Sequence, residues 1–140
     1  MTPQEGGGYP ERLRFHEFAF ERLANGRCRA RVVLTWADGR QFVGESEGVI
    51  SQAGELRCSA QAAVRALERV VQPKLTFEVL GVKGVRAFDA TVVIVSLAAK
   101  AEAAVSRLVG SYLTDKDQAR GAALAVLNAT NRMLGNYYSR

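Results

Sequence analysis

One pattern occurs twice in this 140-residue chain, and it constrains the fold more than any other feature of the sequence. The matching segments lie 60 to 66 residues apart: Leu13–Phe15 with Leu75–Phe77, Ala30–Leu34 with Ala90–Ile94, Phe42–Gly44 with Leu108–Gly110, and Ala62–Leu67 with Ala122–Leu127. Matches at a nearly constant offset indicate an internal repeat. We therefore expect two similar structural units in succession.

The first half predicts a three-stranded meander followed by a helix. Its strand-like segments, which contain β-branched and aromatic residues, cover 13–22, 28–36 and 41–49. The dipeptide Asp38-Gly39 favours a tight turn between the last two strands. A polar loop at 50–57 then leads to an amphipathic helix over 58–71, which ends before Pro73 because proline has no amide hydrogen to donate.

The second half repeats this order. Three strands are expected over 74–82, 88–97 and 107–113, with the alanine-rich segment 98–106 as a long loop, and a helix is expected over about 117–134. The predicted fold is α+β. It consists of two βββα units, at about 13–72 and 73–135, and each antiparallel three-stranded sheet is covered by its own helix. Residues 1–12, with three consecutive glycines and two prolines, are expected to form a disordered tail.

Composition narrows the functional classes. The formal charge of +5 suits nucleic-acid contact, but acidic residues interrupt any basic stripe, so a nucleic-acid partner is not expected. One histidine, His16, and two cysteines, Cys28 and Cys58, cannot form the usual four-ligand zinc site, so we expect no metal or other cofactor. Both cysteines are interpreted as reduced, buried thiols.

The sequence has neither a membrane-spanning segment nor a signal peptide in its hydropathy pattern. No run of about 18 apolar residues is present, and residues 1–12 lack an apolar core. We therefore expect a cytoplasmic protein.

The second half resembles a known family. Its third strand carries Gly110, a Thr114–Asp117 turn leads into the helix, small residues Gly121, Ala122 and Ala123 follow, and the helix closes with Leu127-Asn-Ala-Thr-Asn-Arg-Met-Leu134. These features resemble the C-terminal allosteric and dimerisation domain of 2-isopropylmalate synthase, which citramalate synthase shares. The likeness covers residues 13–135.

The resemblance implies a pseudo-twofold pair of βββα units that binds leucine or isoleucine close to a dimer interface. The catalytic part of those synthases is a metal-dependent barrel, and a barrel needs about 250 residues. Because none fits here, we expect a stand-alone regulatory domain that is not an enzyme.

The start of the first helix is one candidate ligand site. In the family a Gly-x-Gly-Pro-x-x-Ala turn precedes this helix, whereas this chain has a longer segment without the proline. Gly48, Gly54 and Ser59 flank unpaired helix amides that can meet an anion, and Arg57 could pair with its charge. The alternative is a solvated loop without a ligand.

The start of the second helix is the other candidate. Thr114, Asp115 and Asp117 precede it, and an aspartate here either caps the helix or meets a ligand's ammonium group. Gly121 and Ala122 either leave room for an aliphatic ligand side chain or allow close packing on the sheet.

The second helix also carries two packing stripes. Gly121, Ala122, Ala125, Ala129 and Met133 share the face expected to contact the sheet. The offset stripe contains Leu124, Leu127, Asn131 and Leu134, with Asn128 beside it, and is expected to contact the neighbouring helix or a second subunit. Asn131 is interpreted as a buried amide at such a contact, since the first unit has Glu68 and Val71 at the positions matched to Asn128 and Asn131.

Three functions follow, in order of preference. The first is a homodimeric regulatory domain that binds a small metabolite such as a branched-chain amino acid. The second is a structural dimerisation or adaptor domain that has no ligand. The third is a nucleic-acid-binding module.

Overall fold

The computed structural model describes residues 13–138, in which three antiparallel strands and a helix occur twice in succession. The elements of the first unit are β2 (Leu13–Arg22), β3 (Arg27–Trp36), β4 (Gln41–Val49) and α1 (Gln52–Val71). Those of the second unit are β5 (Thr76–Ala87), β6 (Ala90–Ala101), β7 (Ala104–Thr114) and α2 (Gln118–Tyr138). The two sheets have the orders β2-β3-β4 and β5-β6-β7, which confirms the predicted α+β fold.

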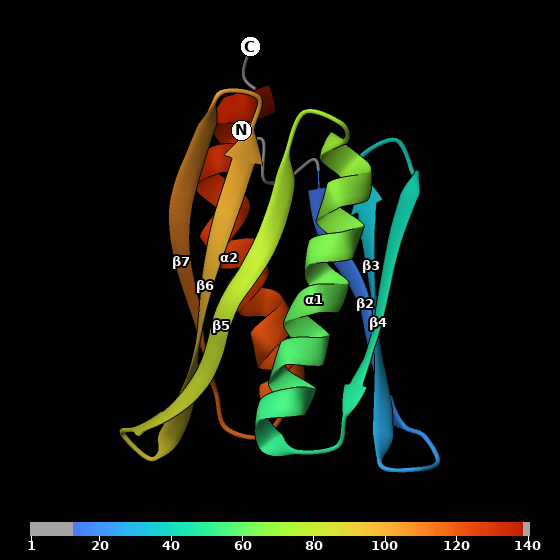
Figure 1. The fold of residues 1–140 in the computed structure, drawn as a ribbon, viewed down its shortest axis with the longest axis vertical. Coiled ribbons are helices and arrows are strands. Elements are labelled where there is room, and N and C mark those ends of the chain that lie inside the picture. The colour runs from blue at the N-terminus through green and yellow to red at the C-terminus, as the bar shows by residue number, and fades with distance from the viewer. Residues whose placement is uncertain (1–12, 139–140) are drawn as a thin grey trace, which may run out of the picture.

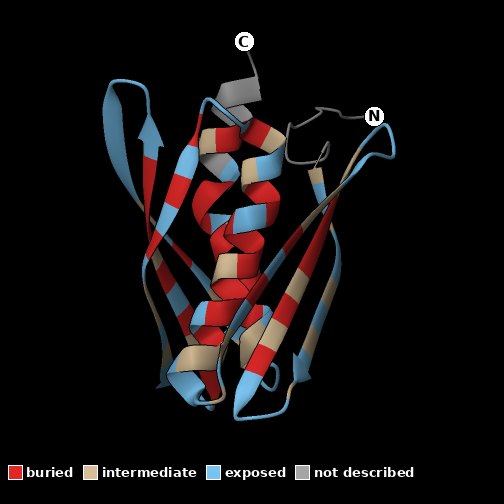
Figure 2. Ribbon diagram, turned by 45° about the vertical axis from the view of Figure 1, so that its right-hand side comes forward, coloured by how far each residue is buried: buried red, intermediate tan, exposed pale blue. Residues whose placement is uncertain are grey.

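The two helices lie between the two sheets (Figure 1). Helix α1 packs on β3 and β4 and also contacts β5, α2 packs on β6 and β7, and the helices contact each other. Both helices are therefore buried over much of their circumference, whereas the strands alternate between buried and exposed residues (Figure 2). The two units share one core, because each helix contacts its own sheet and the other unit.

A glycine on the third strand of each sheet sets the distance between sheet and helix. A Cβ atom on Gly44 would overlap the backbone of Ala62 and Ala66 in α1, and one on Gly110 would overlap the backbone of Ala125 and its neighbour Ala129 in α2. Alanines at these helix positions keep the approach close.

This contact corrects the alignment of the repeat. The match of Phe42–Gly44 with Leu108–Gly110, 66 residues apart, is confirmed. Gly44 pairs with Val32 and Gly110 with Val95, so the central strands and the helices are related by 63 residues and not by 60. The shift of 60 is wrong because it would align Leu34, which is buried against the helix, with Ile94, which faces away from it.

Two segments that were predicted as loops are regular structure. Helix α1 begins at Gln52 and not at residue 58, because the Ser51 hydroxyl caps it by accepting from the Gly54 amide at 2.9 Å. Segment 98–106 is not a long loop, since β6 continues to Ala101 and β7 begins at Ala104, and Ala99 pairs with Ser106. Alanines are weak strand formers, and here pairing with both neighbouring strands overrides that weakness.

Neither α1 nor α2 is long and apolar enough to cross a membrane, within the part of the chain that the structure describes. The tail predicted at 1–12 lies outside the described residues.

Candidate functional site

The first turns of α1 and α2 meet at one end of the molecule, the lower end in Figure 1. At the start of α2, the Asp117 carboxylate accepts from the Arg120 amide at 3.0 Å, and the Thr114 hydroxyl accepts from the Lys116 amide at 3.3 Å. Both helices therefore begin at a side-chain cap that accepts from the amide three residues further on. Their positive dipole ends are directed toward this same end of the molecule.

A pocket of about 390 Å³ lies between these helix starts and β2, and we call it the helix-start pocket. Its lining comes from three elements and the turn before α2: Phe20, Arg22, Gln52, Glu55, Leu56, Lys116, Asp117, Gln118 and Ala119. The volume is within the range of small-molecule sites.

The charges around the helix-start pocket are mixed. Arg22 and Lys116 are basic, while Glu55 and Asp117 are acidic, and Arg22 Nη2 lies 3.4 Å from Glu55 Oε2. The two helix dipoles add positive potential near the basic groups. This arrangement can hold a molecule that carries both a carboxylate and an ammonium group.

The side-chain oxygen of one residue that lines the helix-start pocket, Gln118, lacks a hydrogen-bond partner among the described residues. The Gln118 side-chain nitrogen donates to the Thr91 hydroxyl at 3.5 Å, whereas Gln118 Oε1 is buried without a hydrogen-bond partner among the described residues. A buried amide oxygen without a partner costs free energy. Because this oxygen is itself buried, it is not exposed to a molecule in the pocket.

The structure separates the predicted residues at the first helix. Gly48, Gly54 and Arg57 line a second pocket of about 370 Å³ between β4 and α1. The Arg57 guanidinium donates to the Val79 carbonyl at 2.9 Å and so joins α1 to β5. Ser59 is buried and donates to the Glu55 carbonyl of its own helix at 2.9 Å, so its hydroxyl lies away from both pockets.

The predicted residues at the second helix are also divided. Asp117 caps α2 and lines the helix-start pocket, whereas Asp115 is exposed and is not part of the lining. Gly121 and Ala122 are buried, and a Cβ on Gly121 would be 3.3 Å from Val93 and Thr114 side chains. Gly121 therefore packs on the sheet, and neither residue borders the pocket.

The α2 stripe that was expected to contact the neighbouring helix or a second subunit has its leucines buried or half-buried within the chain itself. Leu134 is buried and Leu124 and Leu127 are half-buried, while Asn128 and Asn131 are exposed. The burial expected for Asn131 is thus not provided by the chain itself.

Asn128 has a different role from the one expected. Its side-chain nitrogen donates to the Ser111 carbonyl on β7 at 2.6 Å. The 63-residue relation places Arg65 at the same position in the first unit, and Arg65 donates to the Glu45 carbonyl on β4 at 2.6 Å. Each helix therefore satisfies one carbonyl on the third strand of its sheet, and the comparison of Asn128 with Glu68 was wrong because it used the 60-residue shift.

The two cysteines do not form a reactive site. Both are buried and free, and the Cys58 thiol donates to the Ser46 carbonyl at 3.1 Å. Burial, together with the neighbouring Cys28, raises the pKa of the Cys58 thiol to about 11, so its reactive thiolate is scarce near neutral pH. Among the described residues, no three histidine, cysteine or carboxylate side chains come together to hold a metal ion.

Sequence reasoning missed most of the helix-start pocket. Phe20, Arg22, Glu55 and Lys116 come from segments that are distant in the sequence, and only their packing brings them together. A signal was present in the repeat, since two equivalent helix starts can share one end of a pseudo-twofold fold, but the packing of the two units was not predictable from periodicity.

Comparison of the chain with protein-family models and with curated proteins finds no match.

Proposed function

We propose that the chain is a non-catalytic regulatory domain that binds a small zwitterionic metabolite, such as a branched-chain amino acid, in the helix-start pocket. The observation that carries this proposal is the meeting of two capped helix starts with Arg22, Lys116 and Glu55 around one small pocket. The resemblance to the allosteric domain of 2-isopropylmalate synthase supports the same class of ligand.

The pocket chemistry suggests how such a ligand would be oriented. Its carboxylate would lie near Lys116 and the helix amides, where the positive ends of both dipoles favour an anion. Its ammonium group would lie near Glu55, and an aliphatic side chain would contact Phe20 and Leu56. The ligand would then replace the weak Arg22–Glu55 ion pair with closer contacts.

Thermal shift measurements against the twenty amino acids and common nucleotides test the proposal. A ligand at about 100 times its dissociation constant should stabilise the fold by about 2.7 kcal/mol and raise the melting temperature accordingly. We expect a branched-chain amino acid to give the largest shift. The absence of a shift with every compound would remove the ligand-binding function.

A pair of lysine variants localises the site. Lys116→Ala should weaken binding by about tenfold, because it removes one charged contact to the carboxylate. Lys74→Ala is the matched control, since Lys74 is also exposed but lies outside the pocket lining. Equal effects of the two substitutions would contradict the site.

The second candidate is a structural dimerisation or adaptor domain without a ligand. The burial of Ser59 and the existing Arg22–Glu55 contact favour it, because both reduce the groups free to bind a ligand at the helix starts. A dimer in solution combined with a silent ligand screen would support this candidate over the first.

Nucleic-acid binding is the least favoured function. On the outer face of the first sheet, Arg27, Arg29 and Arg31 each lie within 4 Å of a glutamate carboxylate. These acidic neighbours oppose the approach of phosphates. A salt-dependent mobility shift of RNA or DNA would reverse this ranking.

A further inference from the structure

The middle of helix α1 reaches solvent along a single line of side chains. From Leu56 to Leu67 its residues are buried, except that Arg57 and Arg65 are exposed and Gln61 is half-buried. Arg69 is exposed one turn further on. Because residues four apart are neighbours on a helix surface, these four side chains form one line, Arg57-Gln61-Arg65-Arg69, which we call the arginine row.

The arginine row borders a groove between β4 and α1. Arg57, Gln61 and Arg65 line the pocket of about 370 Å³ described above, together with residues of β4. Arg65 and Arg69 line a neighbouring pocket of about 360 Å³, again against β4. The two pockets adjoin because Arg65 lines both. In Figure 1 the groove lies in the opening between β5 and β4, where α1 is visible along its length.

Two arginines of the row are held by the strands on either side of α1. Arg57 Nη2 donates to the Val79 carbonyl on β5 at 2.9 Å, and Arg65 Nη1 donates to the Glu45 carbonyl on β4 at 2.6 Å. Each contact uses only part of a guanidinium group, which has five N–H donors. These arginines are therefore oriented before a partner arrives and keep donors for it, which lowers the entropy cost of binding.

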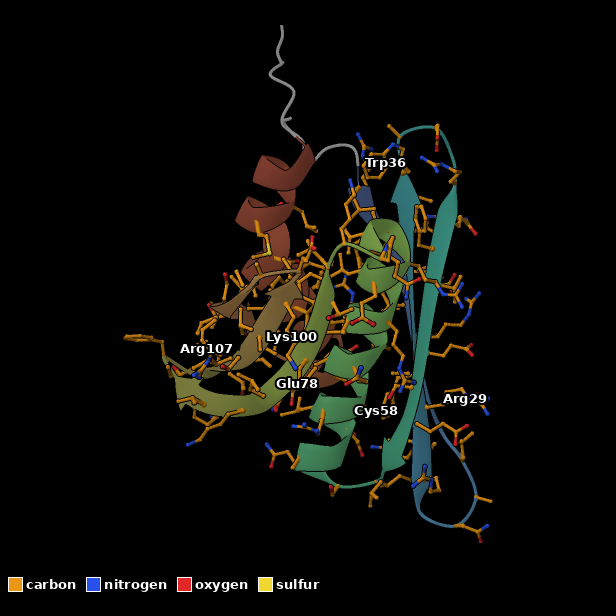
Figure 3. All side chains as sticks on the ribbon, turned by 45° about the horizontal axis from the view of Figure 1, so that its top comes forward. Arg29, Trp36, Cys58, Glu78, Lys100 and Arg107 are labelled. Atoms are coloured by element: carbon orange, nitrogen blue, oxygen red, sulfur yellow. The ribbon has the colours of Figure 1, made fainter. Side chains whose placement is uncertain are left out.

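The three arginines of the row have no carboxylate partner within 4 Å among the described residues. The arginines of β3 differ, since Arg29 lies 2.9 Å from Glu47 and Arg31 lies 3.5 Å from Glu45. Figure 3 shows Arg29 on the side of β4 that faces away from α1, with Cys58 between α1 and β4. The carboxylates of β4 are therefore paired on the outer face and do not neutralise the arginine row.

One acidic side chain of α1 lies beside the row. Glu68 is the single acidic residue between Leu56 and Val71, and its Oε2 accepts from the Phe77 amide on β5 at 2.7 Å. This carboxylate is half-buried and is already used by the strand. The groove thus keeps an excess of positive charge within the part of the chain that the structure describes.

We propose that the arginine row binds an extended acidic peptide segment of another protein, in which carboxylates alternate with other residues. Successive members of the row are about 6 Å apart, which is the rise of four helical residues. Alternate side chains on one face of an extended chain are about 6.7 Å apart. The long arginine side chains accommodate this small difference, and their forked donors match carboxylates. Gln61 then bonds the peptide side chain between the first two arginines.

The groove favours a peptide over a nucleic acid. The row is about 18 Å long, the length of about five or six extended residues. The described lining of the two pockets contains no aromatic side chain, whereas sites for single-stranded nucleic acids normally include aromatic rings on which bases stack. In addition, β4 is an edge strand, and its outer backbone groups can pair with a peptide backbone.

Fluorescence anisotropy of a labelled peptide tests the site. The probe is a peptide of alternating glutamate and threonine that spans the row, and the full chain is titrated from about 10 µM to about 1 mM at low salt. We expect a dissociation constant of about 100 µM, which rises as salt screens the charges. The absence of binding at about 1 mM would overturn the proposal.

A second peptide tests the spacing of the carboxylates. It has the same composition as the first, but its glutamates follow one another in a single block. Because only alternate side chains share one face of an extended chain, this peptide should bind about threefold more weakly or worse. Equal affinity for the two peptides would overturn the proposed match between peptide and helix.

A pair of arginine variants localises the site. Arg69→Gln should weaken peptide binding about fivefold, because it removes one arginine–carboxylate contact while breaking no hydrogen bond or ion pair of the described chain. Arg107→Gln is the matched control, since Arg107 is also an exposed arginine but lies on β7, away from β4 (Figure 3). Equal weakening by the two substitutions would indicate attraction by overall charge and overturn the site.

The same titration with labelled oligothymidine tests the identity of the partner. Weaker binding of the DNA than of the alternating peptide would support the proposal. Tighter binding of the DNA, reduced by Arg69→Gln, would show that the groove holds a nucleic acid and that the peptide is the wrong occupant.

This proposal is independent of the metabolite proposed above. The two pockets of the groove share no lining residue with the helix-start pocket. Arg69→Gln should therefore leave unchanged the thermal shift produced by any amino acid that stabilises the wild-type chain. A chain that binds the alternating peptide but no amino acid would lose the metabolite function and keep the peptide site.

Discussion

The two βββα units keep the same contact between helix and sheet but differ on the opposite face of the sheet. Gly44 and Gly110 occupy equivalent positions, and both allow a helix backbone to approach the third strand. The outer faces have diverged, with glutamates and arginines on the first sheet and a mixture of exposed aliphatic side chains and the Glu78–Lys100 ion pair on the second. The difference teaches that the contact between helix and sheet constrains the two glycines, since a Cβ atom there would overlap helix backbone, whereas no such contact constrains the outer faces.

The largest loss of folding stability should come from placing a side chain at Gly44 or Gly110, where helix backbone lies against the strand. Gly44→Val and Gly110→Val should each destabilise the fold by about 3 kcal/mol or more, because the new side chain would collide with helix backbone that cannot rotate away. Urea denaturation measures both. Gly81→Ala is the control, since a Cβ there meets no atom within 4 Å, and a loss comparable to that of the valine variants would contradict this account.

A smaller loss of stability should come from removing the two side chains, Asn128 and Arg65, that donate hydrogen bonds to the third strands. Asn128→Leu and Arg65→Leu should each cost about 1 kcal/mol, the contribution of one hydrogen bond to a backbone carbonyl. Asn128→Gln should lose less than Asn128→Leu, because its amide can still donate. If the leucine variants match the wild-type chain in thermal unfolding, these contacts carry no stability.

The buried Cys58 thiol should make stability depend on alkaline pH. The folded pKa of Cys58 is about 11, above the ordinary thiol value of 9.0. The stabilising contribution of the neutral thiol is therefore complete below about pH 9 and is lost as the pH rises toward 11. Cys58→Ala should show a smaller decline than the wild-type chain in melting temperature across this window, and parallel declines would argue against the shift.

The smallest change in melting temperature should come from removing a charge on the outer face of the first sheet. Hydrogen bonding to Glu47, followed by the attraction of the glutamates, raises the pKa of Arg29, so this arginine stays charged throughout the accessible range. Arg29→Leu should lower the melting temperature slightly at low salt, and added salt should reduce the difference because it screens exposed pairs. A salt-independent loss would point to packing and not to charge.

The sequence predicted the order of elements because the apolar pattern repeats and the strands and helices have distinct periods. It failed at the start of α1, where the polar residues of 50–57 concealed a helix capped by Ser51. It also failed at Ala98–Ala101, since pairing partners and not local propensity keep these residues in β6.

The candidate site was less predictable than the fold. Asp117 was identified because a carboxylate before a helix has few roles, whereas Arg22 and Phe20 reach the pocket only through the packing of β2 near α2. That packing depends on the relative placement of the two units, which no local pattern contains.

The helix-start pocket joins parts of the chain that lie far apart in the sequence, from Phe20 in β2 to Ala119 in α2. Strand β2 is an edge strand that pairs only with β3 and has few contacts with the helices, within the described residues. A bound molecule would therefore act as a reversible cross-link between the beginning and the end of the fold. Its presence should be recorded most clearly as slower amide exchange in β2, the strand most easily released from the domain.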